Sequence, residues 1–156
     1  MKLEFENTKL EFYLKNYKSD YSVEQSDDNW CNVSIKIENK YLNYNEYGEL
    51  LECCEVDNIY NNIGELLADE LKSITKIEFI EPNIEFILYP KHDLREDENI
   101  TFVKEGHEIV DISMDMKINL FIDGYLTSQS YSIGFTRNEI KEFYECLKET
   151  INKNDN

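Results

Sequence analysis

The sequence is poor in basic residues, in glycine and in long apolar runs. It holds 16 Lys and Arg against 33 Asp and Glu, which gives a net charge of −17. A field this negative repels nucleic acid and anionic membranes and attracts basic proteins. We therefore expect a basic protein partner, no nucleic acid and no membrane. The simpler alternative is that the acidity only keeps the protein in solution.

Several common functional segments are missing as well. The five glycines are scattered, so no glycine-rich loop can cradle a phosphate, and no serine lies in a G-x-S-x-G turn. No apolar run approaches the roughly 18 residues that cross a bilayer, and the N-terminus lacks the apolar stretch of a signal peptide. The four cysteines lack metal-type spacing. We interpret them as reduced thiols of a cytoplasmic protein and expect no cofactor.

The most regular stretch that is present runs from His107 to Ile122. Apolar residues occupy every second position from Val110 onward, with Asp111 and Asp115 among the polar residues between them. Successive side chains of a strand point to opposite faces, so the pattern predicts one long strand with an apolar face and a wet face bearing carboxylates. We expect this strand to lie in an antiparallel sheet that is covered on one side.

Alternation and turn signals predict further strands around this stretch. They fall at residues 3–5, 10–12, 31–38, 49–56, 77–79, 84–89, 100–103 and 131–135. Residues 40–48 suit a turn or an edge strand, and residues 16–29 suit a loop. Turns are expected at Glu105-Gly106 and Asp123-Gly124. The 84–89 strand is apolar on both faces and should be central.

Two helices are predicted. Behind Asp57 as a cap, apolar residues follow helical spacing from Ile59 to Leu71. Thr136 and Glu139 form a capping box for a second helix with an apolar stripe, and residues 152–156 should fray. The expected fold is α+β: a single antiparallel, meander-like sheet with two helices packed on one face, in one domain over residues 1–156.

No group of residues predicts catalysis or metal binding. His107, Glu108 and Asp111 have a tempting spacing, but on a strand residues 107 and 111 lie roughly 13 Å apart. Asp111 and Asp115 are likewise too distant for a glycosidase pair. The acidic segment after His92 lacks the ligand order of an EF-hand, so it is a solvated loop or a contact surface for a basic partner. We expect no metal site and no enzyme activity.

Trp30 admits two interpretations, because it stands just before a predicted strand. It can pack in the core or at a sheet edge, or it can anchor a partner, since Trp and Tyr are enriched in interface hot spots. The tyrosines at positions 41, 44 and 47 carry the same ambiguity.

Several features together resemble the WapI-type immunity proteins, the antidotes to bacterial polymorphic and contact-dependent toxins. These features are Asn29-Trp30 before a strand, the ELLECCEV segment before the helix at Asp57, and the step Glu81-Pro82-Asn83-x-Glu85-Phe86. The long alternating strand, a short aromatic strand and a terminal helix complete the order. The resemblance covers residues 28–150 and leaves the N-terminal hairpin outside.

The resemblance implies a cytoplasmic protein, a monomer or weak homodimer, that binds the C-terminal domain of a toxin and blocks it without chemistry. Many such toxins are nucleases with basic grooves, which an acidic face can occupy. An acidic DNA mimic, another protein-interaction module and a small-molecule enzyme remain as alternatives. The candidate toxin-binding residues are Asp93, Glu96, Asp97, Glu98, Asp111, Asp115 and Trp30.

Overall fold

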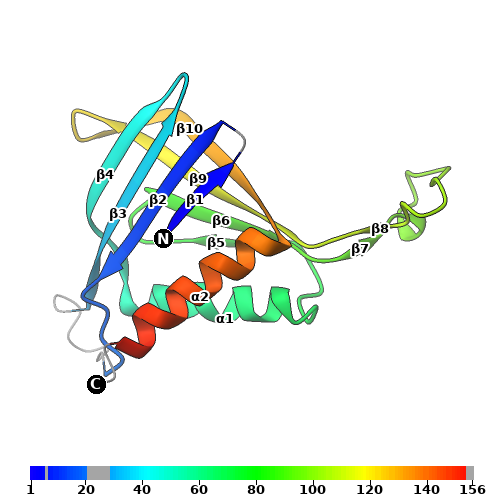
Figure 1. Cartoon of the computed structure of the whole chain (residues 1–156), viewed down its shortest axis with the longest axis horizontal. Helices are drawn as coiled ribbons and strands as arrows, with labels where there is room; N and C mark the ends of the chain where they lie inside the picture. The colour runs from blue at the N-terminus through cyan, green and yellow to red at the C-terminus, as the bar shows by residue number, and fades with distance from the viewer. Residues whose placement is uncertain (6, 21–28, 154–156) are drawn as a thin grey trace. The chain divides into compact units, whose positions relative to one another are not determined.

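The computed structural model describes residues 1–5, 7–20 and 29–153 of the chain (Figure 1). Within these residues, ten strands form three antiparallel sheets, so the prediction of a single sheet is wrong, while the α+β class and the two helices are confirmed. The chain groups into two compact units, residues 1–61, 79–81 and 142–156, and residues 62–78 and 82–141. Each helix begins in one unit and ends in the other.

The first unit holds a sheet of four strands in chain order: β1 (Lys2–Phe5), β2 (Thr8–Lys15), β3 (Trp30–Asn39) and β4 (Asn43–Glu52). The hairpin of β1 and β2 is confirmed, with Leu3 opposite Leu10. Residues 43–48 belong to the edge strand β4. One face of the sheet is buried, through Leu3, Leu10, Phe12, Cys31, Val33, Ile35 and Ile37. Of the predicted loop at 16–29, residues 21–28 lie outside the described residues.

The first helix, α1 (Cys53–Leu67), begins earlier than the sequence predicts. The expected strand at 49–56 ends at Glu52, because the carboxylate of Glu55 accepts a hydrogen bond from the Glu52 backbone N–H over 2.8 Å. This bond is half of a capping box and starts the helix at Cys53 rather than behind Asp57. The carboxylate of Asp57 instead accepts the Tyr17 hydroxyl over 2.7 Å.

The second unit holds a sheet in the order β10-β9-β6-β5. Its strands are β5 (Thr75–Glu78), β6 (Ile84–Tyr89), β9 (Ser113–Ile122) and β10 (Tyr125–Thr136), so the central place of the 84–89 strand is confirmed. Asp123 and Gly124, with φ of 52° and 79°, make the predicted turn between β9 and β10. The buried face carries Ile84, Phe86, Leu88, Met114, Met116, Ile118, Ile133 and Phe135.

A third, two-stranded sheet continues the β6–β9 pair outward. It consists of β7 (His92–Asp93) and β8 (Ile109–Val110), and its turn includes the 3-10 helix η2 (Leu94–Glu96). Figure 1 shows these elements running away from β6 and β9. The register is unbroken, since Tyr89 pairs with Ser113 and His92 with Val110.

The predicted long strand from His107 to Ile122 is therefore interrupted at residues 111–112. Pro90, on the opposite strand, has no N–H to donate, and the Asp111 carboxylate accepts the N–H of Ile112 over 2.9 Å. Both effects remove ladder bonds at the same level. The strand predicted at 100–103 is also absent, because this segment lies beyond the last paired residues and has no strand to pair with.

The second helix, α2 (Arg137–Lys153), begins where the capping residues predict. The Glu139 carboxylate accepts both the backbone N–H and the hydroxyl of Thr136, each over 2.6 Å. In the first unit Phe143 packs on Phe12 of β2, with ring centroids 5.3 Å apart. Residues 152 and 153 are helical rather than frayed, and residues 154–156 lie outside the described part of the chain.

Glu55 gives a direct test of this local account. Its two carboxylate oxygens accept the backbone N–H groups of Glu52 and Ile80, each over 2.8 Å. Removing the acceptor in Glu55→Ala should lower the free energy of unfolding by about 1–2 kcal/mol, measured by urea denaturation. Glu65→Ala, on the exposed side of the same helix, is the matched control and should change it by less than about 0.5 kcal/mol. Equal stability of the two variants would contradict this role.

Candidate functional site

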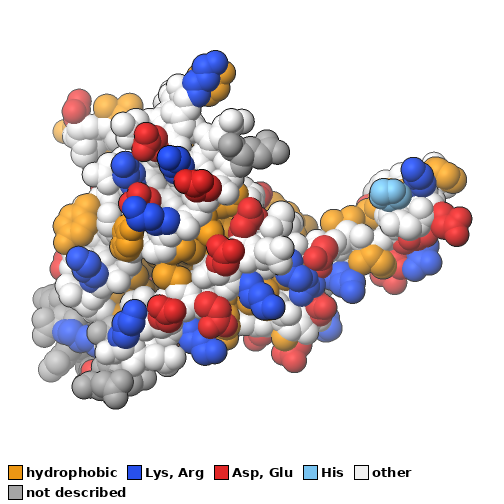
Figure 2. Space-filling model, viewed as in Figure 1, with side chains coloured by type: hydrophobic (Ala, Val, Ile, Leu, Met, Phe, Trp, Pro, Cys, Tyr) orange, Lys and Arg blue, Asp and Glu red, His pale blue; other side chains and the backbone are white. Residues whose placement is uncertain are grey.

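The candidate site is the segment that projects from the second unit, residues 90–112, which we call the arm. It carries seven Asp and Glu against three Lys and Arg. Figure 2 shows acidic, basic and hydrophobic side chains together on its surface, with apolar atoms at its outer end. Four of the residues predicted to bind a toxin, Asp93, Glu96, Asp97 and Glu98, lie here, and a fifth, Asp111, stands at its base.

Local hydrogen bonds hold the arm in shape. The Leu94 N–H donates to the Glu108 carbonyl over 2.8 Å and closes the β7–β8 ladder. Beyond this pair lie residues 95–107, which we call the tip. Within it the Ile100 N–H donates to the Asp97 carbonyl, and the His107 N–H donates to the Lys104 carbonyl, each over 3.0 Å. The Glu105-Gly106 turn is confirmed, with Gly106 at φ 84°.

Two of the arm's carboxylates serve this local structure. Asp93 caps η2 and forms an ion pair with the guanidinium of Arg95, whose hydrogen bonds lower the pKa of Asp93 to about 2. The carboxylate of Asp97 accepts the backbone N–H and the side-chain amide of Asn99, and these bonds lower its pKa. Both groups therefore already have partners within the arm.

Glu96 and Glu98 differ from these two. Both are exposed, and neither forms an ion pair or hydrogen bond with another described residue. Their charges therefore face solvent, and the Arg95 guanidinium is the cation near Glu96. Of the acidic residues predicted on the arm, these two are the best placed to contact a basic partner.

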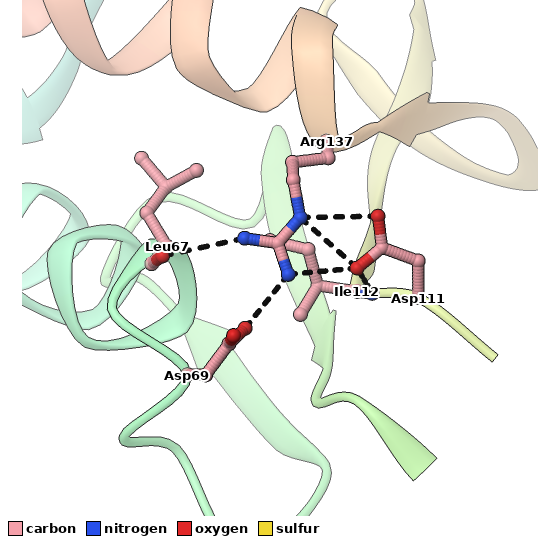
Figure 3. A network of polar contacts seen from close by, with 5 residues as sticks. All are labelled: Leu67, Asp69, Asp111, Ile112 and Arg137. Carbon is pink, nitrogen blue, oxygen red and sulfur yellow. Dashed lines mark hydrogen bonds and ion pairs between the residues drawn. The ribbon is translucent and has the colours of Figure 1, made fainter. Parts of the chain in front are cut away.

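The base of the arm is fixed by Arg137, the first residue of α2 (Figure 3). Its guanidinium donates three hydrogen bonds to Asp111, from Nε to both carboxylate oxygens at 3.0 Å and from Nη2 to Oδ1 at 2.7 Å. Nη2 also donates to Asp69 over 2.7 Å. A longer bond of 3.4 Å reaches the carbonyl of Leu67, at the end of α1. The hydrogen bonds from Arg137 lower the pKa of Asp111. Asp111 is thus a structural ion-pair partner rather than a carboxylate facing only water.

Asp115 also departs from the prediction, which placed it with Asp111 on one bare carboxylate face. Asp111 precedes β9, and Asp115 is half-buried within β9 and accepts the Tyr89 hydroxyl over 3.2 Å. Two lysines neutralise the neighbouring Glu85, Lys117 at 2.9 Å and Lys76 at 3.2 Å. Burial alone would raise the pKa of Glu85, but its hydrogen bonds to these lysines lower it. The polar face of this sheet is therefore largely charge-balanced.

Trp30 lies in the first unit and is a separate candidate. It is half-buried as the first residue of β3, opposite Glu52 of β4. Among the three tyrosines, Tyr41 and Tyr47 are exposed, and Tyr44 is half-buried and donates to Glu46 over 2.8 Å. Trp30 and Tyr44 are therefore partly buried against the sheet, whereas the rings of Tyr41 and Tyr47 face solvent.

The described residues contain no group of three or more His, Cys, Asp or Glu placed to hold a metal ion. Glu108 accepts the Gly106 N–H over 3.0 Å, and Asp111 holds Arg137, so the spacing of His107, Glu108 and Asp111 does not build a ligand set. Cys31 and Cys53 approach to 3.6 Å between sulfurs, where burial raises the pKa of Cys31. In the same part of the chain no helix is long and apolar enough to span a membrane.

Sequence reasoning missed the apolar residues of the arm. Phe102 is 81% exposed at the tip, and Ile109 and Val110 are about half exposed on β8. Their β-favouring sequence suggested strands of a covered sheet. The available signal was the density of charge on both sides of residues 100–103, which is unusual for a core strand.

The comparisons with known proteins agree with the resemblance seen in the sequence. A family model described as the immunity protein WapI-like family matches residues 2–154. The match is wider than the 28–150 expected from the sequence and takes in the N-terminal hairpin. The searches of curated proteins and of solved structures gave no match.

Substitution of Arg137 tests the ion-pair cluster at the base of the arm. Arg137→Gln removes the ion pairs and should lower the free energy of unfolding by about 1 kcal/mol. The loss is no larger because a third of the Arg137 side chain is exposed and solvent screens the pairs. The lowered pKa of Asp111 means that its pair stabilises the fold fully above the ordinary value of 3.8 and is lost as the pH falls further. The difference from the wild type should therefore narrow below pH 3.8 in denaturation curves.

The matched control is Lys148→Gln, which removes an exposed pair with Glu145 at 3.8 Å. It should leave the free energy of unfolding within about 0.5 kcal/mol of the wild type. The proposed importance of Arg137 is refuted if both variants behave alike at neutral pH.

Proposed function

The chain belongs to the immunity protein WapI-like family, and we propose that it binds the toxic C-terminal domain of a cognate bacterial toxin and blocks it. The family match carries this proposal, because the family indicates toxin neutralisation as the general role. Neutralisation by binding needs no catalytic group of the inhibitor's own. In this proposal the protein is not an enzyme and acts in the cytoplasm of the cell that makes it, as a monomer or weak homodimer.

The charge of the chain indicates the class of toxin. A net charge of −17 favours association with a basic surface and speeds the encounter at low salt. Nucleases have such surfaces, since their substrate grooves bind phosphates. We therefore propose a nuclease domain as the partner, with the acidic protein lying over the groove that the nucleic acid would occupy.

The seven residues predicted from the sequence form the proposed contact set, and their surroundings give an order in which to test them. Glu96 and Glu98 come first, because they are exposed and form no hydrogen bond or ion pair with another described residue. Asp93, Asp97, Asp111 and Asp115 follow, since each also has a structural partner. Trp30 is tested separately, as a half-buried ring in the first unit.

Co-expression with the C-terminal domain of the protein encoded immediately upstream tests the general function. Cells that make this domain should die or stop growing, and cells that also make the present chain should grow. In a binding assay the chain should form a complex with this domain but not with unrelated basic proteins. Competition with duplex DNA for several unrelated basic proteins would instead support the DNA-mimic alternative.

Charge reversal tests the acidic surface. Glu96→Lys with Glu98→Lys should slow association with the toxin domain about tenfold at low salt and make the association rate less sensitive to salt, measured by stopped flow. Glu65→Lys with Glu70→Lys changes the net charge by the same amount at exposed positions outside the arm, so it is the matched control. An equal loss of rate in both pairs would show that net charge acts without a localised surface.

A further inference from the structure

The tip of the arm exposes an aromatic side chain that no charge or fold requirement explains. Phe102 is 81% exposed, and it has no hydroxyl with which to bind water. Scattered apolar residues are normal on a protein surface, but Ile109 and Val110 are also about half exposed on the same arm. Apolar side chains among charged ones on one projecting element are typical of an interaction surface.

The arm is also prepared for binding before a partner arrives. Its ladder is closed by the Leu94–Glu108 hydrogen bond, and the ion pair of Asp93 with Arg95 and the Asp97–Asn99 bonds hold the turn. At the base, Arg137 fixes Asp111. An element that is already ordered loses little conformational entropy when it enters a cleft, which favours affinity.

We infer that the tip enters a cleft of the toxin domain, with Phe102 as an apolar anchor and Glu96, Glu98 and Glu105 as charges that meet basic side chains around that cleft. This inference rests on the proposed function. It adds Phe102, Ile109 and Val110 to the contact residues of the proposed function, which are acidic residues and Trp30. Anchors of this kind, surrounded by polar contacts that exclude water, commonly dominate the affinity of an interface.

The charge of the arm selects a basic protein as the occupant. A second copy of this chain would bring an equally acidic arm, within a protein of net charge −17, and like charges oppose that contact. Anionic membranes are disfavoured for the same reason, although an exposed Phe by itself suits a lipid surface. A cleft surrounded by basic side chains can take up Phe102 and pair with the acidic side chains of the tip.

Phe102→Ala in the full chain tests the anchor against the purified toxin domain. We expect faster dissociation and a Kd about 10- to 100-fold higher than that of the wild type. This ratio of the two Kd values should change little when salt is added. Tyr125→Ala is the matched control, since Tyr125 is 78% exposed at the start of β10, outside the arm, and its loss should leave the Kd unchanged. Glu96→Lys with Glu98→Lys should instead slow association, in a salt-dependent manner.

Replacement of residues 95–107 by Asn-Gly tests the whole tip. The Leu94–Glu108 pair is the kind of hydrogen-bonded pair that a two-residue hairpin turn closes, so the shortened ladder can form. Thermal unfolding of the variant should match the wild type, because the removed residues contribute no buried side chain. We expect this variant to lose protection in the co-expression assay.

The outcomes separate the two proposals. If the wild type protects cells, and the Phe102→Ala and Asn-Gly variants bind and protect equally well, the tip is not the contact. Glu96, Asp97 and Glu98 then leave the proposed contact set, and the general function of toxin neutralisation stands. If the wild type itself fails to protect, the proposed function falls and the inference with it. A dimer of the free chain that Phe102→Ala abolishes in sedimentation would assign the tip to a second copy and overturn the inference.

Discussion

The candidate site in the second unit depends on the hydrogen bonds and ion pairs that the Arg137 guanidinium makes. Its planar set of donors reaches the last turn of α1 at Leu67, the loop residue Asp69 and the base of the arm at Asp111. An arginine suits this position because its donors lie in a fixed fork and stay charged at any physiological pH. The start of α2 and the base of the arm are thereby held to the end of α1.

The acidic residues of the same unit fall into two groups, those paired on the sheet and those exposed on the arm. On the four-stranded sheet Glu85 lies between two lysines, and Asp115 receives a tyrosine hydroxyl. These contacts stabilise the sheet and leave little bare charge. On the tip of the arm, Glu96 and Glu98 form no hydrogen bond or ion pair with another described residue. This difference is why we propose the arm, rather than the polar face of β9, as the surface for a basic partner.

Prediction from the sequence succeeded where a local pattern was sufficient. The alternation through Met114 and Met116 marks a real strand with a buried face, and Thr136 and Glu139 mark the start of a helix. It failed where two local patterns competed or a partner was missing. At Cys53 the capping carboxylate of Glu55 overrode an apolar strand pattern, and residues 100–103 had no strand to pair with. The sequence indicated the acidic residues of the arm as candidate contacts, whereas it placed Phe102 in a strand that does not form.

The order and type of neighbouring residues alone specify the periods of the strands and helices, the turns, the acidity and the family resemblance. The tertiary structure decided which strands pair, so that three sheets form in place of one. It also decided which carboxylates are neutralised and which side chains stay exposed. Arg137 meets partners that lie 26 and 68 residues away along the chain. Ion pairing and burial depend on such distant neighbours, and no local pattern specifies them.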